Sequence, residues 1–426
     1  MSSISARVPK ERTAAIPRTW RDKSEQFRVI RRGRLVPKRR VVVTGLVATY
    51  PMGGVAWDYL QYVQGFHALG CEVTYLEDTG QWLYDPAAQT FTDDVRRNAS
   101  HLHDALASLD PALARRWSLR APDGAYHGLD EPAVARACAA ADLFLNLSGS
   151  CWLRDAYRTA RVKAYVDTDP GYSQAKIAAV DADMGDESVR FSVDLIRQHD
   201  VFFTLGEEIG RPGCPIPTGG LTWYPTRQPI VLANWPVRQA PDGPFTTVMS
   251  WKIEPTPPSL GGRVYGGKDV EFERFMDLPS RTAETLEVAL SGAAPRARLV
   301  AAGWRVRDAH EVSATMDAYR DYVVGSRGEW SIAKNAYVAL GSGWFSTRTA
   351  AYLACGRPAV VQETGWSAHL PPGPGLHAFT TAAEAVAALA AIRADYARAC
   401  GHAREVAEAH FRAEDVCARL LADAGV

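Results

Sequence analysis

The chain has 426 residues, a length that predicts two domains or more. With 47% hydrophobic and 23% charged residues, its composition is typical of a globular protein and excludes a disordered scaffold or a small disulfide-stapled module. Basic and acidic side chains are equal at 48 each, but residues 1–40 hold 13 basic and 3 acidic ones, so this segment has a net charge of about +10, which the rest of the chain balances.

The first segment, residues 1–38, is too charged and too often interrupted by proline to bury a hydrophobic face. We expect a flexible basic arm there that mainly solubilises the protein. Contact with anionic lipid, with nucleic acid or with the acidic remainder of the chain is an alternative role, and a mitochondrial transit peptide is another. None of these alternatives is favoured by the sequence.

Residues 39–210 alternate between apolar runs and helical patterns. A β-branched run at 41–47, a loop at Pro51-Met52-Gly53-Gly54, a helical pattern to Gly70 and a second apolar run at 71–76 form a β-α-β unit. Further buried strands are expected at 142–146, 163–167 and Val201–Thr204. This pattern predicts an α/β domain with a doubly wound parallel sheet.

A Pro/Gly-rich stretch at 211–245 predicts a linker along the surface. A second α/β pattern fills 246–426, with strands expected at 245–251, 297–302, 358–362 and Leu376–Phe379, and helices at 281–290 and 348–354. From residue 382 to about residue 424, apolar residues recur at helical spacing, so the chain is expected to close with two or three helices.

The segment Gly341-Ser342-Gly343-Trp344-Phe345-Ser346-Thr347-Arg348 precedes one of these helices. Glycine lets the backbone approach a ligand closely, and Ser346 or Thr347 can cap a helix whose free N–H groups face an anion. Arg348 in the first helical turn opposes the helix dipole unless an anion compensates it, and its guanidinium suits a diphosphate. The segment therefore predicts a phosphate site, and Trp344 within it is a candidate for stacking on a ligand.

This segment, with the Ala354-Cys355-Gly356-Arg357-Pro358 turn after it, resembles the nucleotide-sugar motif of GT-B glycosyltransferases. The Gly53-Gly54 loop and the strand start at Gly70-Cys71 are similar to the matching loop of the large retaining family numbered four. The resemblance covers most of residues 40–426 and implies two Rossmann-like domains facing a cleft. It also implies that Gly53, Gly54, Gly343, Ser346, Thr347 and Arg348 face the donor diphosphate.

The sequence departs from that family at two positions. Where the retaining enzymes usually place two glutamates, this chain has Gly343 and Ala351. Glu363 or Glu329 is a candidate substitute for the carboxylate that grips the donor ribose, and the residue pattern does not choose between them. The resemblance therefore leaves the nucleotide and the anomeric outcome open.

A diphosphate leaving group gains negative charge as it departs, so basic side chains are needed near it. Lys268, beside Gly266 and Gly267, and Arg327 are the main candidates, with Lys334 as a weaker one. If these side chains stabilise the charge, no metal ion and no other cofactor is required. The alternative for each is an ordinary surface ion pair.

An acceptor hydroxyl or thiol must lose a proton during inverting transfer. Asp167 and Asp169 end a predicted strand in an Asp-x-Asp pattern, which also resembles the metal site of GT-A transferases, although Asp169 can equally cap a turn. Asp58 follows the Gly53-Gly54 loop by one helical turn, and Glu207 follows another strand. These four carboxylates are the catalytic candidates, and His127 is a further candidate for the acid–base residue.

The sequence thus predicts a glycosyltransferase that moves a sugar from a nucleoside-diphosphate sugar to a small-molecule acceptor, in bacterial specialised metabolism. An epimerase or phosphorylase of the same fold, or a noncatalytic nucleotide-binding partner, is the alternative. Seven scattered cysteines without zinc spacing favour a reduced, cytoplasmic protein, and no apolar run suits a membrane span. No nucleic-acid partner is expected, and the oligomeric state, including a homodimer, stays open.

Overall fold

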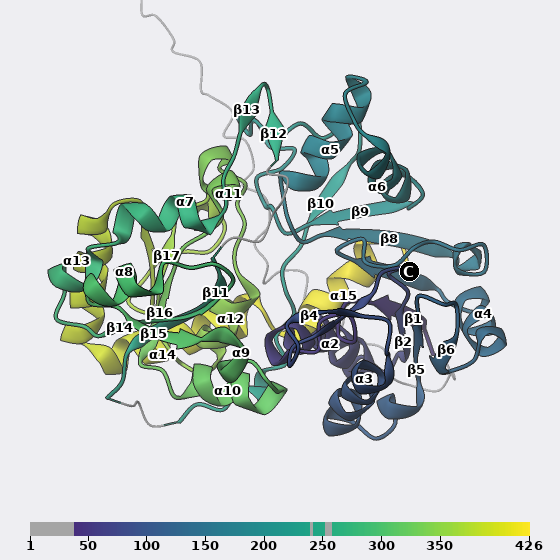
Figure 1. Ribbon diagram of the computed structural model, residues 1–426, viewed down its shortest axis with the longest axis horizontal. Coiled ribbons are helices and arrows are strands. Elements are labelled where there is room, and N and C mark those ends of the chain that lie inside the picture. The colour runs from purple at the N-terminus through teal and green to yellow at the C-terminus, as the bar shows by residue number, and fades with distance from the viewer. Residues whose placement is uncertain (1–37, 239–241, 252–257) are drawn as a thin grey trace, which may run out of the picture. The chain divides into compact units, whose positions relative to one another are not determined.

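The computed structural model describes residues 38–238, 242–251 and 258–426 (Figure 1). The predicted basic arm lies outside the described residues except for Lys38. All the described residues belong to one compact unit. Within it, two sheets with their helices form what we call the N-terminal and C-terminal lobes (Figure 1).

The N-terminal lobe is built on an eight-stranded sheet in the order β10-β9-β8-β7-β1-β2-β5-β6. All neighbours pair in parallel except β5 and β6, which are antiparallel. The predicted strands at 41–47, 71–76, 142–146, 163–167 and 201–204 are confirmed in this sheet. Its strands are β1 (Arg40–Thr44), β2 (Glu72–Glu77), β5 (Trp117–Arg120), β6 (Tyr126–Gly128), β7 (Leu143–Leu147), β8 (Val162–Asp167), β9 (Val201–Thr204) and β10 (Trp223–Pro225).

The C-terminal lobe contains a six-stranded, wholly parallel sheet in the order β15-β14-β11-β16-β17-β18. Strands with helices on both faces are buried on both sides, which is why they read as short apolar runs. The strands are β11 (Phe245–Ser250), β14 (Leu286–Ser291), β15 (Arg305–Asp308), β16 (Gly328–Ser331), β17 (Ala359–Gln362) and β18 (Leu376–Phe379). Two small hairpins lie outside the main sheets: β3 (Leu83–Asp85) with β4 (Thr90–Thr92), and β12 (Ser259–Leu260) with β13 (Arg263–Val264).

The helices connect successive strands of the two parallel sheets. In the N-terminal lobe they are α2 (Gly53–Ala68), α3 (Arg96–Leu109), α4 (Glu131–Ala139), α5 (Tyr172–Asp181) and α6 (Glu187–Arg197). In the C-terminal lobe they are α7 (Lys268–Phe272), α8 (Arg296–Ala301), α9 (Ala309–Val312), α10 (Met316–Val324), α11 (Asn335–Leu340) and α12 (Thr347–Ala354).

The chain closes with three helices, as the apolar spacing predicts: α13 (Ala382–Ala394), α14 (Tyr396–His410) and α15 (Ala413–Asp423). A capping box at Thr381 and Glu384 starts α13. The last helix, α15, packs on α2 of the N-terminal lobe, so the C-terminus returns to the first sheet (Figure 1). Gly65 of α2 allows this contact, because a Cβ there would lie 2.6 Å from Cys417 Sγ.

Two predicted elements of the C-terminal lobe are wrong. Residues 297–302, expected as a strand, belong to helix α8, which begins after Pro295 and consists of good helix formers. Residues 281–290, expected as a helix, contain the start of strand β14 instead. Leu286, Val288 and Leu290 are buried at a spacing of two, which is the strand period.

Part of the predicted surface linker is integrated in the lobes. Strand β10 joins the edge of the first sheet, and Ile230 and Trp235 are fully buried. Ile230 also exchanges backbone hydrogen bonds with Phe411 and Ala413, beside the start of α15. The prolines of this stretch therefore accompany the edge strand β10 and a buried segment that contacts α15, and do not mark a linker exposed over its whole length.

None of the helices in the described part of the chain combines the length and apolar character of a membrane span.

Candidate functional site

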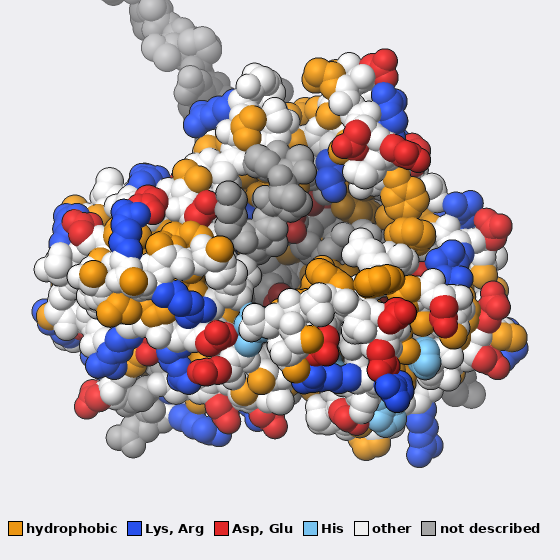
Figure 2. Space-filling model, in the orientation of Figure 1, with side chains coloured by type: hydrophobic (Ala, Val, Ile, Leu, Met, Phe, Trp, Pro, Cys, Tyr) orange, Lys and Arg blue, Asp and Glu red, His pale blue; other side chains and the backbone are white. Residues whose placement is uncertain are grey.

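The candidate site is a cavity of about 570 Å³ lined by both lobes. Its lining comes from the carboxyl ends of β7, β11 and β14 and from the loops after β1, β7, β8 and β9, where ligands bind in open α/β sheets. Helices α2, α9 and α10 and the first turns of α7 and α12 complete it. Figure 2 shows the surface hollowed in the middle of one face. We call this space the central cavity.

The C-terminal wall of the central cavity carries the predicted phosphate residues Ser346, Thr347 and Arg348, with Trp344 beside them. Helix α12 begins at Thr347, and Ser346 makes no side-chain capping hydrogen bond, so the N-terminal end of this helix is available to an anion. The Trp344 ring packs on Tyr337, with the ring centroids 4.7 Å apart.

Arg348 is held in place by three contacts of its guanidinium. Nε donates to Glu329 Oε1 at 2.5 Å, one terminal nitrogen donates to the Val248 carbonyl at 2.8 Å, and the other donates to Ser331 Oγ at 2.6 Å. Glu329 is completely buried and compensates the charge of Arg348. Glu329 is therefore committed to Arg348, which differs from its expected role as a ribose ligand.

Lys268 begins helix α7 and faces the same cavity. Burial in the wall lowers its pKa to about 7, and the neighbouring positive charges of Arg348 and Lys334 add to this effect. Among the described residues, no carboxylate lies within 4 Å of the Lys268 ammonium group. A bound anion would supply the missing negative charge.

The N-terminal wall carries two carboxylates. Asp58 is exposed within the cavity, but desolvation by the surrounding walls raises its pKa to about 7, and the nearby Arg348, Thr347 and Lys268 offset only part of the increase. Asp58 keeps solvent contact through the cavity, so its proton can exchange. A carboxyl group with a pKa near neutral can take up a proton during a reaction.

Asp169 has the opposite character. Desolvation by the cavity wall disfavours its charge, although its side chain is 51% exposed, but the Lys334 ammonium group 2.8 Å from Oδ1 and the Tyr337 hydroxyl, which donates to the same oxygen, hold the pKa of Asp169 below its usual value. Lys334 thus acts here as the ion-pair partner of Asp169. This ion pair joins the two lobes, because Asp169 follows β8 and Lys334 precedes α11.

Gly53 and Gly54 lie at the start of α2 but contact the C-terminal lobe. The Gly53 N–H donates to the Ser313 carbonyl at 2.7 Å, and the Gly54 N–H donates to Ser313 Oγ at 3.0 Å. A Cβ at Gly53 would lie 2.0 Å from the Thr315 carbonyl oxygen. These glycines therefore let α2 approach the α9–α10 loop closely. Gly54 lines the cavity, whereas Gly53 does not.

Two predicted catalytic residues lie outside the central cavity. Asp167 is buried and accepts hydrogen bonds from Ser173, Gln174 and Thr204 at 2.8 to 2.9 Å, although burial raises its pKa to about 6. Glu207 forms a buried ion pair with Arg227, with its carboxylate 2.6 Å from Arg227 Nε. Both therefore support the fold in this structure rather than facing a ligand.

Three predicted donor ligands also lie away from the cavity. Arg327 pairs with Glu284 and stacks on Tyr396, whose ring centroid is 4.3 Å from the guanidinium carbon. Gly343 packs against the backbone of Glu207 and Glu208. Glu363 accepts a hydrogen bond from the Gly365 N–H at 2.6 Å, which fixes the loop after β17.

Sequence reasoning missed several lining residues, of which Ser148 is the most distinctive. It follows strand β7 and adopts a left-handed conformation, with φ of 59°, which is uncommon for a residue other than glycine. Its hydroxyl group is 3.0 Å from the Tyr59 hydroxyl and 2.7 Å from Thr168 Oγ1. The small polar run Ser148-Gly149-Ser150 directly after a buried strand is the signal that could have identified this position.

The sequence matches no family model and no curated protein. Solved structures are nevertheless similar over almost the whole chain. An α-glucosyltransferase solved with UDP and DNA is 11% identical, with a TM-score of 0.55, and the match covers 92% of this chain and 100% of that one. The chain has the GT-B fold.

Two further structures agree with this assignment. HepE of Anabaena, solved with UDP and glucose, is 10% identical with a TM-score of 0.50, and the match covers 90% of this chain and 98% of HepE. Sucrose-phosphate synthase of Thermosynechococcus elongatus is 11% identical with a TM-score of 0.50, over 90% and 97% of the two chains. The predicted fold class, two Rossmann-like lobes around a cleft, is confirmed.

Proposed function

We propose that the protein is a glycosyltransferase that moves a sugar from a nucleoside-diphosphate sugar to a small-molecule acceptor. The observation that carries the proposal is the division of charge in the central cavity, with cations and a helix N-terminus on one wall and carboxylates on the other. The GT-B neighbours support it, since one is an α-glucosyltransferase solved with UDP and another, HepE, was solved with UDP and glucose.

On the C-terminal wall, Lys268, Arg348 and the first N–H groups of α12 bind the donor diphosphate in this proposal. Arg348 is pre-oriented by Glu329 and Ser331, so little reorganisation accompanies binding. Lys268 gains its full charge when the anion arrives. These groups stabilise the charge that develops on the leaving diphosphate, so the proposal requires no metal ion.

On the N-terminal wall, Asp58 serves as the base. The acceptor oxygen forms a bond to the anomeric carbon of the sugar, and the bond from that carbon to the diphosphate oxygen breaks. The departing diphosphate keeps the bonding electron pair, and the acceptor proton passes to the Asp58 carboxylate. A pKa of about 7 suits this transfer, because the group is substantially ionised at neutral pH yet basic enough to hold the proton.

The cellular setting is also part of the proposal. All seven cysteines are free, which supports a reducing compartment such as the cytoplasm. If the enzyme acts in specialised metabolism, it should prefer acceptors other than sugars. If it catalyses an epimerase-type or phosphorylase-type reaction instead, it should turn over the donor with water or phosphate alone.

The first test is a thermal-shift and calorimetry panel of UDP, GDP, dTDP, ADP and their common sugars, with Mg²⁺ or with EDTA. A ligand at a hundred times its dissociation constant stabilises a protein by about 2.7 kcal/mol. One nucleotide class should stand out, and its effect should persist in EDTA. Lys268→Gln should lose about half of the shift or more, whereas Lys38→Gln, a change at an exposed lysine before β1, should retain it. A panel without any binder would overturn the proposal.

A further inference from the structure

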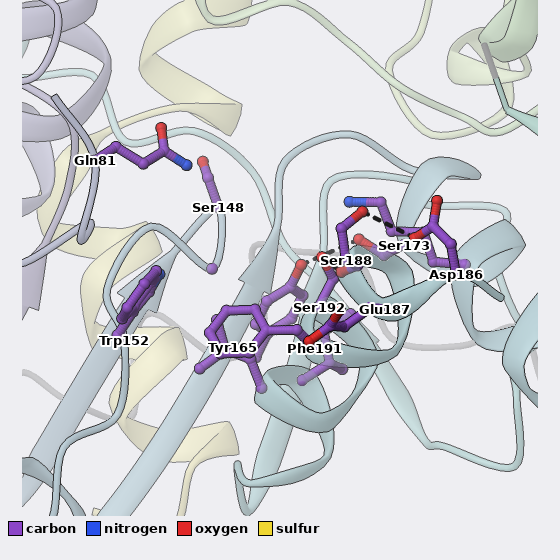
Figure 3. A pocket seen from close by; sticks show the side chains of 14 residues that line it. Gln81, Ser148, Trp152, Tyr165, Ser173, Asp186, Glu187, Ser188, Phe191 and Ser192 are labelled. Atoms are coloured by element: carbon purple, nitrogen blue, oxygen red, sulfur yellow. Dashed lines mark hydrogen bonds between the residues drawn. The ribbon is translucent and has the colours of Figure 1, made fainter. Parts of the chain in front are cut away.

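A second cavity, of about 700 Å³, lies in the N-terminal lobe. Helices α5 and α6 and the loop after β7 form its walls, as Figure 3 shows. Ser148 lines this cavity and the central cavity as well, so it lies at the boundary between the two spaces. We call the second space the aromatic cavity; its size is within the range of about 300–1,000 Å³ that is usual for sites of drug-sized molecules.

Three aromatic rings line the aromatic cavity. Trp152 and Phe191 meet edge to face, with ring centroids 5.1 Å apart, and Tyr165 lies beside them in Figure 3. Phe191 is 47% exposed, so part of its ring faces the cavity lining rather than the core. Exposed ring surface inside a concave space is a favourable contact for a flat apolar molecule.

The polar groups of the aromatic cavity are distributed around these rings. In the view of Figure 3, Gln81 and Ser148 lie toward one end and Asp186 and Ser188 toward the other. Ser192 of α6 adds a hydroxyl group near the rings. Such a mixture suits an aromatic ligand that carries hydroxyl groups, because a few polar contacts orient it while the rings hold its body.

The junction between the two cavities is a strained segment. Ser148 and Gly149 both have positive φ values, 59° and 60°, and the Ser148 hydroxyl is bonded to Tyr59 and Thr168. A Cβ at Gly149 would lie 2.7 Å from the Tyr165 ring, so the segment approaches that ring as closely as only glycine allows. Asp58 and Ser148 both line the central cavity, and Tyr59, whose hydroxyl group contacts Ser148, follows Asp58 on helix α2.

We propose that the aromatic cavity binds the acceptor, and that the acceptor is a planar aromatic molecule with a hydroxyl group. This inference rests on the proposed function. The aromatic body lies against Trp152 and Phe191, and the hydroxyl group passes Ser148 into the central cavity. There its oxygen bonds to the anomeric carbon, the diphosphate leaves with the electron pair of the broken bond, and the hydroxyl proton passes to Asp58.

Binding can be tested without turnover by using 4-methylumbelliferone, a fluorescent hydroxycoumarin, in equilibrium dialysis. The wild-type protein should bind it, and Phe191→Ala should weaken binding about tenfold, as expected for the loss of one aromatic contact. Ser192→Trp, which fills the cavity, should abolish binding. Failure of the wild-type protein to bind, or unchanged binding by the filled variant, overturns the inference.

Turnover gives the second readout, with the nucleotide sugar that binds best in the panel of UDP, GDP, dTDP and ADP sugars. Phe191→Ala should raise the KM for 4-methylumbelliferone about tenfold and leave the donor dissociation constant unchanged. Phe91→Ala is the matched control, because Phe91 is also 47% exposed but lies on β4, outside the lining of both cavities.

The two proposals fail in different ways. If no nucleotide sugar binds, the glycosyltransferase proposal fails, whatever the dialysis shows. The aromatic-acceptor inference fails, and the glycosyltransferase proposal stands, if a donor binds and its sugar passes to cellobiose but not to 4-methylumbelliferone. The same conclusion follows if Phe91→Ala raises the acceptor KM as much as Phe191→Ala does.

Discussion

The two walls of the central cavity obtain their charges in different ways. On the C-terminal wall, Arg348 is fixed by a buried carboxylate, whereas Lys268 stands without a carboxylate within 4 Å among the described residues. On the N-terminal wall, Asp169 is fixed by Lys334, whereas Asp58 has a raised pKa. Each wall thus has one side chain whose charge is fixed by an ion pair and one whose pKa is shifted to about 7. We call the second two, Lys268 and Asp58, the responsive pair, and we expect them to bind the donor and to accept the proton.

The largest effect is expected at Asp58. Asp58→Asn should lower kcat by about 10²- to 10⁴-fold, the usual contribution of a general base, and leave donor binding unchanged. Asp93→Asn, at an exposed loop position, is the control. Normal turnover by Asp58→Asn would remove it from the mechanism.

The next effect concerns the fixed pair of the C-terminal wall. Glu329→Gln leaves Arg348 buried without its partner, and it should destabilise the protein by about 3 kcal/mol, as measured by the midpoint of denaturant unfolding. Glu273→Gln, which breaks the exposed pair with Arg298, should cost less than about 1 kcal/mol. Equal losses in the two variants would show that Arg348 does not depend on Glu329.

Lys268 should have a smaller effect, and on donor affinity rather than stability. Lys268→Met removes one charged contact to the diphosphate and should weaken donor binding about tenfold to a hundredfold in calorimetry. The fold should be retained, because Lys268 makes no ion pair that would be broken within the described residues. An unchanged donor dissociation constant would place the diphosphate elsewhere.

The responsive pair also predicts a pH profile. Lys268 has a pKa of about 7 and binds an anion better when charged, so donor affinity should fall as pH rises above 7. Asp58 must be ionised to accept a proton, so turnover should fall as pH drops below 7. The profile of kcat/KM for the donor should therefore be a narrow bell near pH 7, whereas kcat at saturating donor should retain only the acid limb. A flat kcat/KM profile from pH 5 to 9 would contradict both assignments.

The sequence predicted the parts of the site that depend on local pattern. Glycines, a helix start and a basic residue in its first turn identified Ser346, Thr347 and Arg348, which line the cavity. It did not predict that Arg348 and Glu329 would pair, because they come from different elements that meet only through the sheet.

The Asp-x-Asp pattern also shows that residue spacing alone does not determine which side chains reach the cavity. Asp167 is the last residue of β8 and turns into the core, where three side chains bind it, while Asp169 lies beyond the strand and reaches the cavity. Residue type and spacing suggested both carboxylates equally. Only the position of the strand end separates their roles, and strand ends are the least certain part of any pattern.

The smallest effect is expected at Asp169, and it tests whether the two carboxylates really differ. Asp169→Asn removes an ion pair whose acidic partner is 51% exposed, and such pairs contribute little, so turnover should fall less than tenfold. The acid limb of the kcat profile should stay near pH 7 in Asp169→Asn, since Asp58 is intact, and should vanish in Asp58→Asn. If the limb instead vanishes with Asp169, then Asp169 is the base, and the ion pair with Lys334 must open when the donor binds.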